Sequence, residues 1–548
     1  MIEDIDLSAI QDETVIKQIR QLLNLVEKLS ADLGALREEN QTLRDEINHL
    51  KGEQGKPNSK ANKTASEETS KHSSETERKQ KRKRHPSNKK DGIKVDRKEV
   101  VKVRVEELPA DAQFKGYVDV VVQDIVVKSD NVLFRKEKYY SPSTGKTYLA
   151  QLPHEYAGQF GPGIKALVPA MYFGIGTSEP KILEFLKHFG LNISKGKLSA
   201  LLIEGQDVFH AESDAVYESG LRSTSYQQSD STLTRVNGQN QNCHVVCNPF
   251  YSVYRTLAHK DRMSILDVLR NGRPRKFRLN QTALDCLANV QLSQATRQTL
   301  TTCCCELEMT EEKFQEHLAF LLPKLGHQQR KEITDAAAIA AYWAETDWPV
   351  IENLVCDDAP HYNKLTRRMM LCWVHEGRPY KKLHPVVPLH RRLLDDFLKR
   401  FWDYYHELLA YKQSPSAAER TRLDTAFDEL FATQTGYEAL DERIAKTRAK
   451  KKSLLLVLEY PELPLHNNAS ELAVRRRVRK RDVSFGPRTE AGKRAWDTFM
   501  TLAETTRKLG VSFYAYLHDR ITGANAILPL ADLISQAAGN FTLPAPTW

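Results

Sequence analysis

A seven-residue repeat near the start of the chain constrains its fold more than any other feature. One core position is occupied by Val15, Leu22, Leu29, Leu36, Leu43 and Leu50, and its companion by Ile19, Val26, Leu33, Asn40 and Ile47. Such a repeat predicts a coiled coil over residues 1–52. Leucine at one position with β-branched residues at much of the other favours two parallel strands, in which Asn40 pairs with its own copy. We therefore expect a homodimer or a higher homo-oligomer. The alternative is an amphipathic helix that packs against its own chain.

The length and composition indicate a multidomain protein. The 548 residues predict about three or four domains, and a hydrophobic content of 41% is enough to form their cores. No apolar run approaches the roughly 18 residues that a membrane-spanning helix needs, and the acidic start is unlike a secretory signal. We expect a cytoplasmic protein with no membrane partner.

The cysteines favour reduced thiols over a disulfide framework. All eight lie at or after Cys243, and three are adjacent at positions 303–305. Cys243-His244-x-x-Cys247 has no matching second pair of ligands, so we interpret it as a strand with small buried side chains rather than a metal site.

Basic residues concentrate in a segment with few apolar side chains. Residues 53–92 are rich in serine and lysine and hold eight lysines and arginines between positions 78 and 90. This composition predicts a disordered basic linker. The linker either contacts phosphates without sequence preference or serves only as a solvated tether.

Two smaller units are expected to follow the linker. Alternating apolar residues at 101–105, 118–127 and 139–149 predict a small β-rich module over residues 93–162. Residues 163–212 then show two amphipathic helices joined by a glycine-containing turn, which predicts a helix-turn-helix that binds DNA. Lys195 and Lys197 would lie near the start of its second helix, where recognition helices meet DNA. Helix pairs of this kind also occur in proteins that bind no DNA.

Acidic residues mark the predicted strands of a larger core over residues 213–510. A strand at 226–236 carries Asp230, two more strand-like runs follow it, and an apolar strand at 351–356 ends at Asp357-Asp358. This pattern suggests a ribonuclease H-like sheet, in which an acid at the carboxyl end of a strand faces the usual ligand crevice. Each aspartate could instead be a turn residue or a helix cap.

Long stretches between the acids favour helices. We expect helical insertions near 271–342 and 389–458, whose aromatic stripes form cores rather than base-stacking platforms. A C-terminal helical tail is expected over 511–548. The predicted fold class is therefore multidomain α/β, with an N-terminal parallel coiled coil ahead of the other units.

A third acid lies at the start of a strongly basic helix. In Asn467-Asn468-x-x-Glu471 the asparagines can cap the helix, which places Glu471 in the first turn and Arg475 one turn further on the same face. A metal-binding carboxylate beside cations that hold DNA phosphates would have this pattern. An ordinary capping-box glutamate on a solvated basic face would also have it.

Four motifs in this order resemble the DDE transposases, and the insertion-sequence sixty-six family in particular. They are Ser229-Asp230-Ser-Thr-x-x-Arg235, Cys356-Asp357-Asp-x-x-x-Tyr362, Cys372-Trp373-Val-His375-x-x-Arg378, and Asn467-Asn468-x-x-Glu471 with the basic helix and Phe485-Gly486 after it. The resemblance covers most of the chain. It differs in one respect: the family often has a cysteine-rich zinc module before the helix-turn-helix, and this chain has no cysteine there, so zinc is not implied.

The resemblance implies a set of site residues. Asp230, Asp357 and Glu471 would be the catalytic triad that holds two Mg²⁺ or Mn²⁺ ions about 3.5 to 4 Å apart. Asp357 is preferred to Asp358 because its spacing to Tyr362 matches the family pattern. The remaining residues would position DNA or the site itself: Arg475, Arg476 and Arg479 on phosphates, and Cys372 and His375 in a structural or DNA-positioning role.

The resemblance also implies an activity and partners. The expected protein is a transposase that acts on bacterial DNA in the cytoplasm and binds the terminal inverted repeats of an insertion sequence and target double-stranded DNA. Its reactions would be phosphodiester hydrolysis and transesterification, with small accessory transposition proteins as further partners. The alternatives are a catalytically inactive dimeric DNA-binding regulator and a coiled-coil scaffold that binds nucleic acid.

Overall fold

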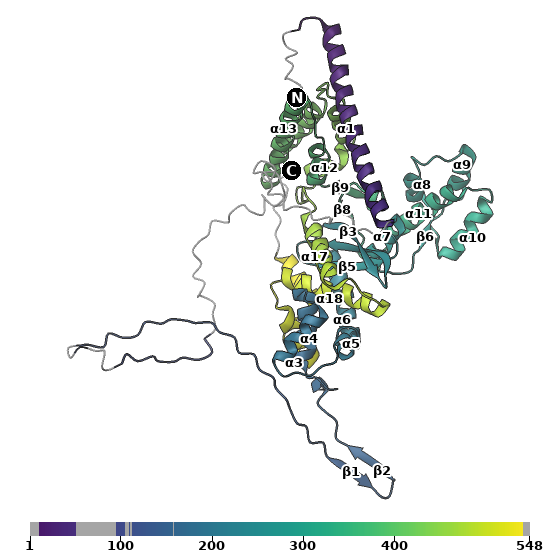
Figure 1. Ribbon diagram of the computed structural model, residues 1–548. Helices are drawn as coiled ribbons and strands as arrows, with labels where there is room; N and C mark the ends of the chain where they lie inside the picture. Colours follow the sequence, from purple (N-terminus) through teal and green to yellow (C-terminus); the bar gives the residue numbers. More distant parts are fainter. Residues whose placement is uncertain (1–9, 51–94, 105–108, 110–111, 157, 541–548) are drawn as a thin grey trace.

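The computed structural model describes residues 10–50, 95–104, 109, 112–156 and 158–540. A central body of sheet and helices holds most of these residues, with a long N-terminal helix and a β-hairpin extending from it (Figure 1). The linker expected at 53–92 lies outside the described residues. Within the described residues no helix is long and apolar enough to cross a membrane.

A mixed five-stranded sheet forms the centre of the body. Its order is β5-β4-β3-β8-β9. The strand bounds are β3 Tyr226–Val236, β4 Gln239–Cys247, β5 Ser252–Leu257, β8 Asn353–Cys356 and β9 Arg368–Leu371. The first three strands are antiparallel, whereas β3, β8 and β9 run parallel. Asn237 and Gly238 both have positive φ, which is the backbone of a tight two-residue hairpin turn, and they connect β3 to β4. Cys243 and Cys247 are buried in β4, as expected for a strand.

Helices that precede β3 in the sequence and helices that follow residue 467 pack around the antiparallel half of the sheet in one hydrophobic core. They are α3 Pro162–Pro169, η4 Ala170–Ile175, α4 Glu179–His188, α5 Lys195–Ile203, α6 Asp207–Arg222, α17 Asn468–Ser484, α18 Glu490–Lys508, α19 Phe513–Thr522 and α20 Leu530–Gly539. The expected helix pair is present as α4 and α5, with Gly190 in the left-handed conformation between them and the Ser194 side chain capping α5.

Two helical segments interrupt the sheet. The first lies between β5 and β8 and consists of α7 Arg262–Leu269, β6 Phe277–Arg278, α8 Gln281–Cys286, α9 Gln294–Thr302, β7 Glu308–Met309, α10 Glu311–Leu321 and α11 His327–Trp343. The loop after β8 contains η5 Pro360–Tyr362. The second segment follows β9 and consists of α12 Trp373–Lys381, α13 Pro388–Gln413, α14 Ala417–Phe431, α15 Glu438–Arg448, α16 Lys451–Leu454 and η6 Leu456–Leu458.

The second helical segment has its own aromatic core. Phe397, Phe401 and Trp402 of α13 are buried beside Trp373 and Phe427. The prediction that this stripe is core rather than a base-stacking surface is therefore confirmed for these three residues.

Part of the small β-rich module predicted over residues 93–162 is present as a hairpin of β1 Lys138–Ser141 and β2 Lys146–Leu149, which the short helix η3 His154–Tyr156 follows. Among the described residues between 95 and 137 there is no strand, and Val118 and Ile125 are 92% and 81% exposed. Alternation favours a strand only where a partner edge can accept its hydrogen bonds, and this segment has none in the described part of the chain.

The N-terminal helix α1 Glu13–Leu50 combines both alternatives drawn from its sequence. Leu23 is buried, and the Asn24 side chain exchanges hydrogen bonds with Gly436 O and Glu438 N at the start of α15. By contrast, Leu29 and Leu36 of the seven-residue repeat are more than half exposed. One side of α1 thus packs on its own chain, while most of the heptad seam remains uncovered.

Candidate active site

Asp230 lies on β3, and Asp357 comes directly after the end of the neighbouring parallel strand β8. Gln228 of β3 pairs with Val355 of β8, so Asp230 and Asp357 both come two residues after this pair. Paired residues of adjacent strands lie on the same face, so we expect Asp357, one residue past β8, on the face that carries Asp230. Adjacent strands are about 4.8 Å apart, which brings the two carboxylates close together at the carboxyl end of β8.

The environment of Asp230 opposes its negative charge. Burial, together with the nearby Asp357 and Glu471 carboxylates, raises the pKa of Asp230 to about 6. The Ser231 N–H donates to Asp230 Oδ1 over 2.7 Å, and this bond and Lys260 partly offset the shift. A carboxylate held this way gains stability from any added positive charge.

The structure separates Asp357 from its neighbour Asp358. Asp357 Oδ1 accepts a hydrogen bond from Ala359 N at 3.2 Å, and the Asp357 charge acts on Asp230. Asp358 is half exposed and forms an ion pair with Lys450 at 2.6 Å. Of the two aspartates, Asp357 is the one whose charge acts on Asp230.

The start of α17 is capped differently from the sequence-based expectation. Asn467 occupies the N-cap position, but its side chain does not cap the helix; its Nδ2 donates to Ser229 O of β3 over 2.7 Å. Gln228 Oε1 instead accepts from Ala469 N at 3.0 Å. The Asn467 side chain is buried against the sheet, so its amide donates to the backbone of β3. The free N–H at the start of α17 donates instead to Gln228, a residue of that strand.

Cys372 completes the attachment of α17. Its Sγ accepts a hydrogen bond from Asn467 N at 3.2 Å, and its own N–H donates to Cys356 O at the end of β8. Burial raises the pKa of the Cys372 thiol to about 11, so it remains a neutral thiol. Cys372 thus connects the end of the sheet to the helix that carries Glu471.

Glu471 lies in the first turn of α17, but its partners come from α12. Arg378 Nη2 donates to both carboxylate oxygens, at 3.0 and 3.2 Å, and His375 Nε2 lies 3.4 Å from Oε1. Burial and the Arg378 charge lower the pKa of His375. No ion pair joins Glu471 to Arg475, although both residues are described. Glu471 therefore pairs with a residue of the neighbouring helix α12 rather than with one of α17.

The basic residues of α17 differ in their surroundings. Arg475 and Arg479 are exposed, whereas Arg476 forms an ion pair with Glu504 at 2.6 Å. Arg477 is buried beside Asp497, and burial lowers the pKa of Lys480 to about 7. Of the three arginines expected on phosphates, Arg475 and Arg479 are therefore open to solvent and Arg476 is partly neutralised.

Sequence reasoning missed the roles of Gln228, Arg378 and Lys260. Arg378 follows His375 by three residues, and this helical spacing places both on one face. The three-residue spacing of His375 and Arg378 could have indicated that the two side chains contact the same partner, which is the Glu471 carboxylate. Gln228 and Lys260 gave no such signal because their partners are far away in the sequence.

The carboxylates of Asp230, Asp357 and Glu471 are suitable ligands for a divalent cation, although the three side chains are not arranged around a common metal position. Carboxylate oxygens are the ligands that Mg²⁺ and Mn²⁺ prefer. Asp230 and Asp357 are level and close, and Glu471 acts on Asp230 electrostatically. Within the described part of the chain, no group of three or more acidic, histidine or cysteine side chains is arranged to hold a metal. Glu471 instead contacts Arg378 and His375.

Comparison with known proteins matches this part of the chain. The model of the family described as "Transposase IS66 family" matches residues 336–495, which contain Asp357, Cys372, His375 and Glu471. The chain is 32% identical over 297 residues to "Uncharacterized protein y4jO" of Sinorhizobium fredii (strain NBRC 101917 / NGR234). The alignment covers 53% of this chain and 89% of that protein. No solved structure matches.

Proposed function

Because this chain belongs to the IS66 family of transposases, we propose that it binds the ends of an insertion sequence and catalyses metal-dependent DNA strand cleavage and strand transfer. The observation that carries the proposal is geometric: Asp230 and Asp357 each come two residues after the paired residues Gln228 of β3 and Val355 of β8. The helix α17, which bears Glu471, is hydrogen-bonded to β3 through Asn467 and Gln228. A buried carboxylate with a raised pKa beside other acids, as at Asp230, is typical of a catalytic site rather than of a solvated surface.

The sheet supports a ribonuclease H-like core. Three antiparallel strands are followed by two parallel ones in the order β5-β4-β3-β8-β9. Asp230 lies on the central strand and Asp357 at the carboxyl end of its neighbour, where open α/β sheets bind their ligands. The helix that bears Glu471 is fixed to the same edge through Gln228 and Cys372.

Asp230 and Asp357 would hold the Mg²⁺ or Mn²⁺ ions, and Glu471 would complete the ligand set after separating from Arg378. Such ions, when bound, activate an attacking oxygen and stabilise the leaving one at phosphorus. Arg378 would then be free to neutralise a DNA phosphate near the acids. Arg475 and Arg479 would hold phosphates along the exposed face of α17, with Arg476 contributing less because of Glu504.

Other elements would supply DNA recognition and pairing of subunits. The exposed Lys195 and Lys197 at the start of α5 are suitably placed for a helix-turn-helix contact with DNA. The uncovered part of the α1 seam, with Asn40 in register, would join two copies of the chain. Small accessory proteins would act with this assembly.

The test is metal-dependent 3′-end nicking of labelled DNA that carries the flanking inverted repeats. Asp230→Asn, Asp357→Asn and Glu471→Gln should each abolish nicking in Mg²⁺ or Mn²⁺ at matched DNA binding. Asp358→Asn is the matched control because that aspartate faces Lys450, and it should retain most activity. Full activity of Asp357→Asn would refute the site. Specific binding without nicking by the unaltered protein, even with accessory proteins added, would favour the inactive regulator.

A further inference from the structure

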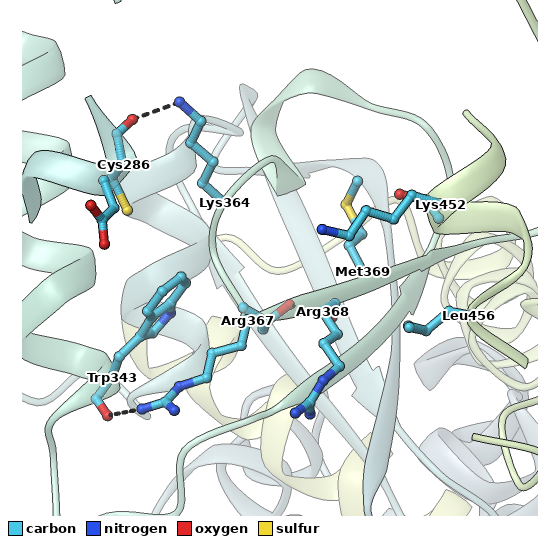
Figure 2. A pocket seen from close by; sticks show the side chains of 11 residues that line it. Cys286, Trp343, Lys364, Arg367, Arg368, Met369, Lys452 and Leu456 are labelled. Atoms are coloured by element: carbon cyan, nitrogen blue, oxygen red, sulfur yellow. Dashed lines mark hydrogen bonds between the residues drawn. The ribbon is translucent and has the colours of Figure 1, made fainter. Parts of the chain in front are cut away.

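A cavity of about 330 Å³ lies at the β9 edge of the sheet, where both helical segments meet it. We call it the β9 pocket; Figure 2 shows the side chains that line it. The lining includes Asp285, Trp343, Lys364, Arg367, Arg368 and Lys452. The lining as a whole comes from α8, α11, the loop before β9, β9 itself, α16 and η6.

Positive charge predominates in this pocket. Its four cationic side chains are those of Lys364, Arg367, Arg368 and Lys452, and its lining contains a single acid, Asp285. Glu352 approaches the two arginines, at 3.6 Å and 3.8 Å. Four cations against two acids leave an excess of two positive charges, which favours an anionic ligand.

The lysines of the pocket are not neutralised by acids in the described part of the chain. Lys364 Nζ donates to a carbonyl, Cys286 O, at 2.6 Å, and Figure 2 shows this bond. Its backbone has φ +66°, a left-handed conformation that is costly for a residue with a side chain. Lys452 is exposed and forms no ion pair with any described residue. Both ammonium groups keep their charge available at the pocket.

The arginines are arranged to contact an incoming anion. Arg367 donates to Trp343 O and lies over the Trp343 ring, while its side chain remains half exposed (Figure 2). Arg368 is held over the Tyr460 ring at 4.7 Å. Guanidinium groups fixed by aromatic rings are pre-organised to donate to phosphate oxygens.

The pocket is separate from the acids. Arg368 pairs with Asn353 in the parallel register of β9 and β8, and Asp357 comes four residues after Asn353. At about 3.3 Å per residue, the arginine lies roughly 13 Å from the aspartate along the strand direction. Duplex DNA carries one charge per about 1.7 Å of its axis, so a duplex at the acids extends well beyond this distance.

We propose that the β9 pocket binds backbone phosphates of the DNA on which the acids act. The inference rests on the proposed function and adds a second anchoring point to it. The exposed positions of Arg367 and Lys452 suit an extended polyanion better than an enclosed small ligand. One phosphate occupies the pocket while its neighbours contact these two side chains.

The test is the salt dependence of DNA affinity, measured by fluorescence anisotropy with a labelled duplex carrying an element end. Each phosphate contact adds about 0.9 to the slope of log affinity against log salt concentration. The double variant Arg367→Gln and Lys452→Gln should therefore reduce this slope by nearly two and weaken binding about tenfold at moderate salt. The charge-conserving pair Arg367→Lys and Lys452→Arg should restore most of the slope.

A matched control separates this pocket from a general charge effect. Lys313 of α10 and Lys399 of α13 are exposed and outside the pocket, so Lys313→Gln with Lys399→Gln removes the same charge. This control should leave the slope within about half a unit of that of the unaltered protein. Equal losses in both double variants would overturn the proposal. Circular dichroism and thermal melting would verify that each variant is folded.

The outcomes also distinguish this inference from the proposed function. An unchanged slope with intact metal-dependent nicking refutes the pocket and leaves the transposase proposal in place. A reduced slope in a protein that cannot nick supports the pocket and counts against catalysis. If inorganic phosphate is bound by the unaltered protein and lost in the pocket variant while DNA affinity is unchanged, the pocket holds small anions and the DNA assignment is wrong.

Discussion

At the scale of single residues, the ionised Asp230 side chain destabilises the folded protein. Its charge is partly buried beside two other carboxylates, and its pKa is raised to about 6 from an ordinary value near 4. The folded protein therefore binds this proton more tightly than the unfolded chain does. Below about pH 4 the side chain is protonated in both states, and the fold carries no penalty from its charge. As the pH rises from about 4 through 6, the side chain ionises and the free energy of unfolding decreases.

Asp230→Asn should accordingly stabilise the metal-free protein. Above pH 6 the gain in the free energy of unfolding should be at most about 3 kcal/mol, at roughly 1.4 kcal/mol per pKa unit, and it should vanish near pH 4. Asparagine keeps the oxygen that accepts from Ser231 N. Chemical denaturation at pH 4 and pH 7.5 in chelator measures the effect. A variant less stable than the unaltered protein at pH 7.5 would contradict this account of the site.

Arg378 should control how readily Glu471 joins a metal. Its guanidinium contacts both carboxylate oxygens, so it competes with a cation for the same atoms. Arg378→Gln should lower the Mn²⁺ concentration for half-maximal nicking several-fold, even if the maximal rate falls through loss of a phosphate contact. Lys382→Gln, at the exposed end of the same helix, is the control. A higher Mn²⁺ requirement would mean that Arg378 orients Glu471 rather than restrains it.

At the scale of elements, α1 is attached by its side rather than by its seam. Glu27 accepts hydrogen bonds from Val386 N and Val387 N, at 3.0 and 2.8 Å, and lies 3.3 Å from His390 Nδ1. The Glu27 carboxylate thereby accepts hydrogen bonds from backbone N–H groups just before α13, which have no partner within that helix. The attachment is confined to the first half of α1, since its residues after Ser30 are exposed wherever their side chains are described.

Glu27→Ala should release the first half of α1 from the core. Leaving the two N–H groups without this acceptor should cost about 1 to 3 kcal/mol, and α1 should become more sensitive to protease. Glu27→Gln keeps an acceptor oxygen and should have a smaller effect. Glu38→Ala, on the exposed second half, is the control. Equal protection of α1 in Glu27→Ala and in the unaltered protein would show that this contact does not hold the helix.

The lysines at the start of α5 allow a test of the helix pair. Lys195 and Lys197 are exposed, and neither forms an ion pair with a described residue. Lys195→Gln with Lys197→Gln should weaken binding to an element-end duplex about tenfold while leaving thermal stability unchanged. Electrophoretic mobility shift measures this effect, with Lys313→Gln and Lys399→Gln as the charge-matched control. Unchanged affinity would exclude this end of α5 from the DNA interface.

Periodicity predicted elements well and contacts between elements poorly. The strands at 226–257 and the helix pair α4–α5 followed from local patterns, and so did the place of Glu471 in its helix. The hydrogen bond from Ala469 N to Gln228 at the start of α17 could not be predicted from a local pattern, because the two residues are 241 positions apart in the sequence. A strand is predicted over residues 118–127 from their β propensity, but these residues form no strand because no neighbouring strand in the described part of the chain pairs with them.

At the scale of the whole molecule, attachment of α1 and pairing of two chains are compatible. The contacts to the core come from Leu23, Asn24 and Glu27, which lie outside the two core positions of the heptad repeat. Leu36 and Leu43 are 60% and 51% exposed, and Leu50 is 85% exposed. A second copy can therefore cover the seam while each α1 stays on its own core, which would hold two acid sites in a defined arrangement.

Disrupting the seam should separate the copies without unfolding either one. Leu36→Asp with Leu43→Asp places charges in the predicted interface, where burial without partners is costly. Light scattering should give twice the 62.6 kDa chain mass for the unaltered protein and the single mass for this variant. Lys28→Asp changes the charge of the same helix outside the seam and should leave the dimer intact. If the unaltered protein is a monomer at all concentrations, the seam has another partner. If the seam variant is a dimer, pairing occurs elsewhere. If dimerisation through α1 does bring two acid sites to one pair of DNA ends, the seam variant should still nick a single end but should lose joint processing of both ends.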